Sequence, residues 1–160
     1  MIHETSDTTR KHFLFPGTLH VDAGECVITT VLGSCVAVCL WDTIKGGGGM
    51  NHFMLPLWNG EGLATPKYGT IAMEKLLEQV LAVGCKKERL VAKVFGGANI
   101  LGMSQAACPI GRRNVELALG TLDDWRIKVV ASDLEGMVGR KIIMNTLTGV
   151  VLMGRGKHKE

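Results

Sequence analysis

The sequence lacks any run of about 18 consecutive apolar residues, the length a helix needs to cross a bilayer. Its first ten residues are mostly polar and contain no apolar core, so they do not resemble a secretory signal. It has no block of like charges and no arginines interleaved with aromatic residues, and its net charge is only +3. These absences argue against a nucleic-acid partner and predict a cytoplasmic protein that inserts into no membrane.

Disulfide and cofactor motifs are missing as well. The five cysteines are an odd number at irregular spacings, and no CxxC occurs, so we expect reduced thiols. Neither of the turns at 96–99 and 110–114 contains the lysine of a phosphate-binding loop, so we expect no nucleotide. Cys35, Cys39 and His52 form a conceivable metal set, but a strand would hold the two cysteines roughly 13 Å apart, too far for one ion. We therefore expect no metal and no cofactor.

What is present fits one globular domain. Hydrophobic residues make up 46% of the 160 residues and charged residues 21%. A chain of this length is expected to bury about two thirds of its unfolded surface. Residues 1–11 are predicted to form a flexible tail, and residues 12–160 a single domain, because no linker or repeat divides them.

Hydrophobic periodicity predicts about eight strands and two long helices. The nearly continuous apolar run 36–41 indicates a strand covered on both faces. Glycines 46–49 indicate a turn, and 50–55 a further strand. Helices are predicted for about 68–83 and from about residue 113. This pattern favours an α+β fold with two packed, mixed or antiparallel sheets, in which each helix covers one sheet face.

Cys35 and His52 are the main candidates for chemistry. Cys35 follows a Gly-Ser turn at the start of the apolar strand, and His52 lies in the next predicted strand. Adjacent strands can place a thiol beside an imidazole, which is the minimum for a cysteine nucleophile with a general base. The imidazole needs an orienting group, and the hydroxyl of Thr29 or Thr30 is available just upstream.

A structural interpretation competes with this one, because free cysteines and single histidines on apolar strands are more often core residues. Cys26, Cys39, Cys85 and Cys108 are predicted to be core fillers of this kind. Cys35 differs through its turn, where backbone N–H groups near Gly33 and Ser34 are suited to bind an oxyanion.

Two further turns are candidate walls of a binding cleft. One contains Gly97, and the other contains Arg112 and Asn114 at a predicted helix start. Helix N-termini and backbone amides bind polar or anionic groups, whereas the structural alternative is a loop followed by a capped helix. The sequence leaves both open.

Several of these motifs together resemble the CheD family, the chemoreceptor glutamine deamidases of bacterial chemotaxis. The resemblance runs from about Gly24 to Gly154. It rests on LeuGlySerCysValAlaVal (32–38), HisPheMetLeuPro (52–56), PheGlyGlyAla (95–98), IleGlyArgArgAsn (110–114) and the GlyArg…ThrGly pattern (139–149).

The resemblance implies an α/β/β/α sandwich, related to the catalytic domain of the cytotoxic necrotizing factor toxins, and a Cys-His-Thr catalytic set. Its members fall on Cys35, His52 and Thr29, with Thr30 as the stand-in for the threonine. The implied substrate is a glutamine on a chemoreceptor helix, and a CheC-type phosphatase is an implied partner. The sequence departs from the family at Asp133-Leu134-Glu135-Gly136, where Glu135 replaces a glycine and adds charge.

Two other functions fit the same residues. A non-catalytic adapter that binds a chemotaxis phosphatase or a receptor would not need Cys35 and His52 together. A receptor methyl-ester thiol esterase would use both residues but would release methanol instead of ammonia.

Overall fold

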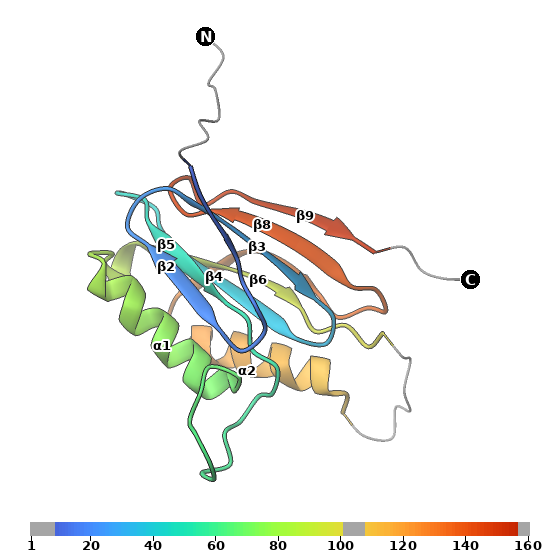
Figure 1. The fold of residues 1–160 in the computed structure, drawn as a ribbon. Coiled ribbons are helices and arrows are strands. Elements are labelled where there is room, and N and C mark those ends of the chain that lie inside the picture. Colours follow the sequence, from blue (N-terminus) through green and yellow to red (C-terminus); the bar gives the residue numbers. More distant parts are fainter. Residues whose placement is uncertain (1–8, 101–107, 157–160) are drawn as a thin grey trace.

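The computed structural model describes residues 9–100 and 108–156, which form two packed sheets and two helices (Figure 1). The four-stranded sheet has the order β1 (Arg10–Phe13), β3 (Cys26–Leu32), β8 (Arg140–Asn145), β9 (Val151–Arg155). The five-stranded sheet has the order β2 (Leu19–Asp22), β5 (Gly48–Asn51), β4 (Val36–Asp42), β6 (Leu90–Gly96), β7 (Lys128–Leu134). The helices are α1 (Gly69–Ala82) and α2 (Ile110–Asp124), with a short 3-10 turn at Lys87–Arg89.

Both sheets are mixed. The β1–β3 and β6–β7 pairs are parallel, and the remaining pairs are antiparallel, including the β8–β9 hairpin. The predicted α+β class with two packed mixed sheets is confirmed.

Strand β4 explains why the two layers hold together. Val36, Val38 and Leu40 point toward the helices, where they join residues of α1 and α2 in one buried cluster. Ala37 and Cys39 point the other way, into a second buried cluster between the sheets. Side chains of a strand alternate between faces, so this strand is covered on both, as its continuous apolar sequence predicts.

The position of the helices differs from the expected one. Both helices contact strands of the five-stranded sheet, and within the described residues the layers run β/β/α (Figure 1). Neither of the described helices covers the outer face of the four-stranded sheet, which leaves apolar side chains such as Val31 and Leu152 exposed. On β3, for example, buried residues alternate with half-buried or exposed ones such as Val27, Thr29 and Val31.

Three element boundaries also differ. Strand β1 begins at Arg10, two residues before the expected start of the domain, and α2 begins at Ile110, directly after Pro109. The turn covers only Gly46 and Gly47, whose φ angles are +76° and +88°, while Gly48 and Gly49 belong to β5. A Cβ on Gly48 or Gly49 would collide with a carbonyl of a neighbouring strand, so glycine here permits close strand approach. None of the described helices is long and apolar enough to cross a membrane.

Candidate active site

Cys35 lies where the Gly33-Ser34 turn enters β4, and the backbone around it is held tightly. The N–H of Gly97 donates to the Cys35 carbonyl at 2.9 Å, and that of Ala98 donates to the Gly33 carbonyl at 3.0 Å. Gly96 has φ +113°, and a Cβ there would collide with the Cys35 carbonyl oxygen. The end of β6 therefore fixes the direction in which the cysteine leaves its turn.

The Cys35 side chain is half-buried and borders a cavity of about 530 Å³ with a mainly apolar wall. The lining residues are Gly33, Ser34, Cys35, Ala98, Asn99, Ile100, Pro109, Ile110 and Gly111. Burial raises the pKa of the Cys35 thiol, while its own backbone N–H acts in the opposite direction. The thiol is thus a protonated group at neutral pH that a base must activate.

His52 lies just after β5 and is 1% exposed. Its backbone is tied on both sides, because its carbonyl accepts from Gly17 N–H at 2.8 Å and its N–H donates to the Thr18 carbonyl at 3.1 Å. Burial lowers the pKa of the imidazole to about 4. His52 is therefore neutral at physiological pH, which is the form a general base requires.

The backbone places Cys35 and His52 on one face of the β4–β5 pair. Val36 and Phe53 form an antiparallel bridge and exchange hydrogen bonds of 3.1 and 3.0 Å. Their preceding neighbours, Cys35 and His52, both point to the opposite face, toward the space between the sheets. Such diagonal neighbours have Cα atoms roughly 7–8 Å apart, which brings long side chains within reach of each other.

Thr30, and not Thr29, contacts the histidine. The Thr30 hydroxyl lies 2.7 Å from His52 Nδ1 and reaches it across the sandwich, from β3 in the other sheet. Thr29 is the next residue on that strand, so its side chain points to the outer face of the four-stranded sheet. The strand alternation decides between the two threonines, and the expectation for Thr29 is corrected in favour of Thr30.

The Thr30 contact also fixes the tautomer of the imidazole. The hydroxyl has one proton, and it donates that proton to the Leu14 carbonyl at 2.7 Å. It must then accept from His52 Nδ1–H, so Nε2 carries the free lone pair. Nε2 is buried and has no hydrogen-bond partner within residues 9–100 and 108–156. This is the atom available to take the thiol proton.

Backbone N–H groups near the thiol are available for an oxyanion. No carbonyl of the described residues accepts the N–H of Ser34 or of Cys35. Both residues line the cavity. Preorganised N–H donors of this kind stabilise the tetrahedral intermediates of acyl transfer.

The other predicted binding residues do not line the cavity that Cys35 borders. Gly97 and Arg112 border a second cavity of about 200 Å³, which shares Asn99 and Pro109 with the first. Arg112 forms an exposed ion pair with Glu135 at 2.9 Å. Glu135 has φ +63°, so it occupies a left-handed position that favours glycine.

Asn114 lines neither of these two cavities and is fully buried on α2. Its Nδ2 donates to the carbonyls of Ser34 and Met54, at 3.1 and 3.0 Å. Of the two alternatives, cleft wall or helix cap, neither describes it. Instead, it links the cysteine segment to the histidine segment.

The remaining cysteines differ from Cys35 in their surroundings. Cys26, Cys39 and Cys85 are buried, as predicted for core residues. Burial raises the pKa of Cys39 to about 12, so this thiol is inert at neutral pH. Cys108 is exposed, and its prediction as a core residue is wrong.

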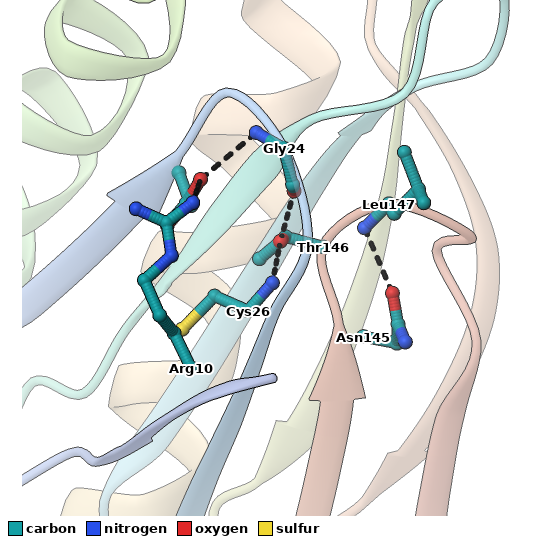
Figure 2. Close-up of polar contacts among 7 residues, drawn as sticks. Arg10, Gly24, Cys26, Asn145, Thr146 and Leu147 are labelled. Carbon is teal, nitrogen blue, oxygen red and sulfur yellow. Dashed lines mark hydrogen bonds and ion pairs between the residues drawn. The ribbon is translucent and has the colours of Figure 1, made fainter. Parts of the chain in front are cut away.

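A second cluster of potential ligands lies at the edge of the sandwich. Side-chain atoms of His20, Asp22 and Cys26 lie within 4.8 Å of one another. Asp22 Oδ1, however, already accepts from the Arg10 guanidinium at 2.9 Å and from Gly24 N–H at 2.8 Å. Figure 2 shows the Arg10 side chain beside the Cys26 sulfur. The Arg10 guanidinium already supplies the positive charge that a metal ion would bring to these ligands. We therefore interpret the cluster as a structural contact that joins β1, β2 and β3.

The backbone at Gly24 and Cys26 is also hydrogen-bonded to the segment that follows β8. Thr146, which follows β8, accepts from Cys26 N–H at 2.8 Å and donates to the Gly24 carbonyl at 2.6 Å (Figure 2). The turn before β3 is thereby fixed to the β8–β9 hairpin, which holds β3, the strand of Thr30, in place.

Comparison with known proteins supports one family. Residues 54–155 match the family model CheD, described as CheD chemotactic sensory transduction. The chain is 74% identical over 159 residues to a probable chemoreceptor glutamine deamidase CheD of Trichlorobacter lovleyi, with 99% of each chain covered. It is 48% identical over 144 residues to a protein of the same name from Sulfurimonas denitrificans, covering 89% of this chain and 92% of that one. A third, from Anaeromyxobacter dehalogenans, is 46% identical over 137 residues, covering 86% and 80%.

Proposed function

The chain belongs to the CheD family, and we propose that it deamidates glutamine side chains of chemoreceptors in the cytoplasm, with Cys35 as the nucleophile and His52 as the base. The relatives' printed names support the substrate class. The observation that carries the residue assignment is the buried His52, whose Nδ1–H is engaged by Thr30 and whose Nε2 is free on the face shared with Cys35.

In the proposed first half-reaction, His52 Nε2 takes the proton of the Cys35 thiol. The thiolate attacks the carboxamide carbon of the glutamine side chain, and the N–H groups of Ser34 and Cys35 hold the resulting oxyanion. The protonated His52 then gives its Nε2 proton to the departing nitrogen, which leaves as ammonia. General base assistance and oxyanion stabilisation each contribute on the order of 10²-fold or more to such a reaction.

In the second half-reaction, His52 takes a proton from water, and the hydroxide attacks the thioester carbon. The tetrahedral intermediate collapses, the Cys35 sulfur leaves and regains a proton from His52, and a glutamate side chain is released. Thr30 keeps the imidazole in the Nδ1–H tautomer throughout, so that Nε2 carries the proton in both directions.

The test is incubation with the cytoplasmic domain of a chemoreceptor, followed by mass spectrometry of its peptides and an ammonia assay. Wild type is expected to convert specific glutamines to glutamates with one ammonia released for each conversion. Methanol release from a methyl-esterified receptor without ammonia release from the glutamine form would instead favour the esterase.

The resemblance alone supports one further proposal, that a CheC-type phosphatase binds this protein. Titration of the chain with such a phosphatase, with Cys35 alkylation as the readout, tests it. Binding over the thiol would protect Cys35, whereas an unchanged rate at saturating phosphatase would contradict occlusion of the site.

A further inference from the structure

The backbone hydrogen bonds that pair the segment of Cys35 with the segment of His52 end just before Cys35 is reached. Val36 and Phe53 form the last reciprocal pair. In a regular antiparallel ladder the next such pair would join Ser34 and Leu55. The Leu55 N–H instead donates to the Lys67 carbonyl at 3.2 Å, so the two segments diverge at the position of the thiol.

The side chain of Asn114 takes the place of this missing backbone pair. From α2 it donates through Nδ2 to the carbonyl of Ser34, directly before Cys35, and to that of Met54, two residues after His52. Because both partners are carbonyls, only the amide nitrogen can face them, which settles the orientation of the carboxamide. The thiol segment is thus held between the Val36–Phe53 bridge on one side and Asn114 on the other.

The complete burial of Asn114 indicates that the two hydrogen bonds of its Nδ2 group have a specific role. The residue is 0% exposed, and its Oδ1 has no hydrogen-bond partner among the described residues. A buried amide with an unmet acceptor is unfavourable for folding, and an apolar residue of similar size would avoid that penalty. Two donors aimed at the segments of Cys35 and His52 account for an asparagine at this position.

We propose that Asn114 is a positioning residue that sets the separation between the Cys35 thiol and the His52 imidazole. The proposal rests on the proposed function of that pair. Without the Asn114 bridge, no described contact sets the spacing of the two segments on the Ser34–Met54 side of the Val36–Phe53 pair, so the distance from the thiol to Nε2 is less tightly fixed. A misplacement of about 1 Å between reacting groups can lower a rate by roughly 10²-fold.

The decisive variant is Asn114→Leu, which keeps the approximate volume and removes both donors. We expect deamidation kcat to fall by roughly 10²-fold, with KM changed only a few-fold, because Asn114 lines neither cavity. The matched control is Leu122→Ala, a fully buried residue on the same helix, about 12 Å farther along the helix axis than Asn114. If Asn114→Leu does not fold, Asn114→Ala replaces it.

A double-mutant cycle separates positioning from general destabilisation. Alkylation of Cys35 by iodoacetamide is measured in wild type, Asn114→Leu, His52→Gln and the double variant. Positioning predicts that Asn114→Leu slows alkylation in the wild-type background but not in the His52→Gln background, since the assistance is already lost there. Equal slowing of alkylation by Asn114→Leu in both backgrounds would overturn the proposal. So would a loss of kcat in Asn114→Leu no greater than the loss in Leu122→Ala, provided that the two variants have similar unfolding midpoints.

This readout keeps the two hypotheses apart. If wild type releases no ammonia from any receptor but the alkylation cycle shows the expected coupling, the proposed function fails and the positioning role stands. If wild type is an active deamidase and the cycle shows no coupling, only the positioning role fails.

Discussion

The buried imidazole of His52 should make the protein measurably less stable in mild acid. Its pKa in the folded state is about 4, lowered by burial, whereas an exposed histidine in the unfolded chain has a pKa near 6.5. Between these values the unfolded state binds more protons than the folded state, so stability rises with pH. The contribution of His52 to the free energy of unfolding is therefore fully present above pH ~6.5 and is lost as the pH falls toward ~4.

The magnitude follows from the difference in pKa. Each pKa unit corresponds to about 1.4 kcal/mol, so a difference of about 2.5 units amounts to about 3.5 kcal/mol at its full extent. Other groups also contribute acid sensitivity of the same sign, including Asp133, whose pKa is lowered mainly by Arg155. Their contributions cancel when wild type is compared with His52→Gln across the pH range.

Urea unfolding of both proteins at several pH values from about 4.5 to about 7.5, a range set by the two pKa values, measures this difference. We expect the unfolding free energy of wild type to fall more steeply with acid than that of His52→Gln, by about 1 kcal/mol for each pH unit below ~6. Parallel curves for the two proteins would refute a neutral, buried His52.

Three further predictions concern neighbouring residues. Thr30→Val removes the partner of His52 Nδ1 and should lower deamidation and slow Cys35 alkylation, whereas Thr29→Val should change neither; kinetic assays of both variants check this. Cys39→Ala should keep the activity and cost about 1–2 kcal/mol of stability through a small core cavity, as measured by urea unfolding. Glu135→Gly should raise the thermal midpoint, because relief of the left-handed strain, about 1 kcal/mol, outweighs an exposed ion pair; a lower midpoint would contradict this.

Local sequence patterns predict much of this fold. The continuous apolar run of β4 indicates a strand buried on both faces, and the helical periodicity of α1 locates that helix within one residue at each end. They do not predict which face of the sandwich the helices cover, because that depends on how segments far apart in the sequence pair into the two sheets. The extension of β5 to Gly48 is missed because glycine usually marks a turn, while here it allows close strand packing.

At the candidate active site, too, local sequence predicts some features, whereas others depend on segments far apart in the chain. The Gly-Ser turn and the apolar strands single out Cys35 and His52, both of which lie on the face toward the other sheet. The choice between Thr29 and Thr30 depends on the register of β3 across the sandwich, which the local sequence does not contain. The Leu14 carbonyl, which completes the hydrogen-bond chain, belongs to the backbone and has no residue-type signal at all.

The most direct test of the account compares Cys35→Ala with Cys39→Ala on a receptor cytoplasmic domain, with peptide mass spectrometry as the readout. We predict that Cys35→Ala produces no glutamate at the sites that wild type converts, while its unfolding midpoint stays close to that of wild type. Cys39→Ala should convert the same sites. Conversion by Cys35→Ala at a rate within a few-fold of wild type would contradict the central claim that this thiol is the nucleophile.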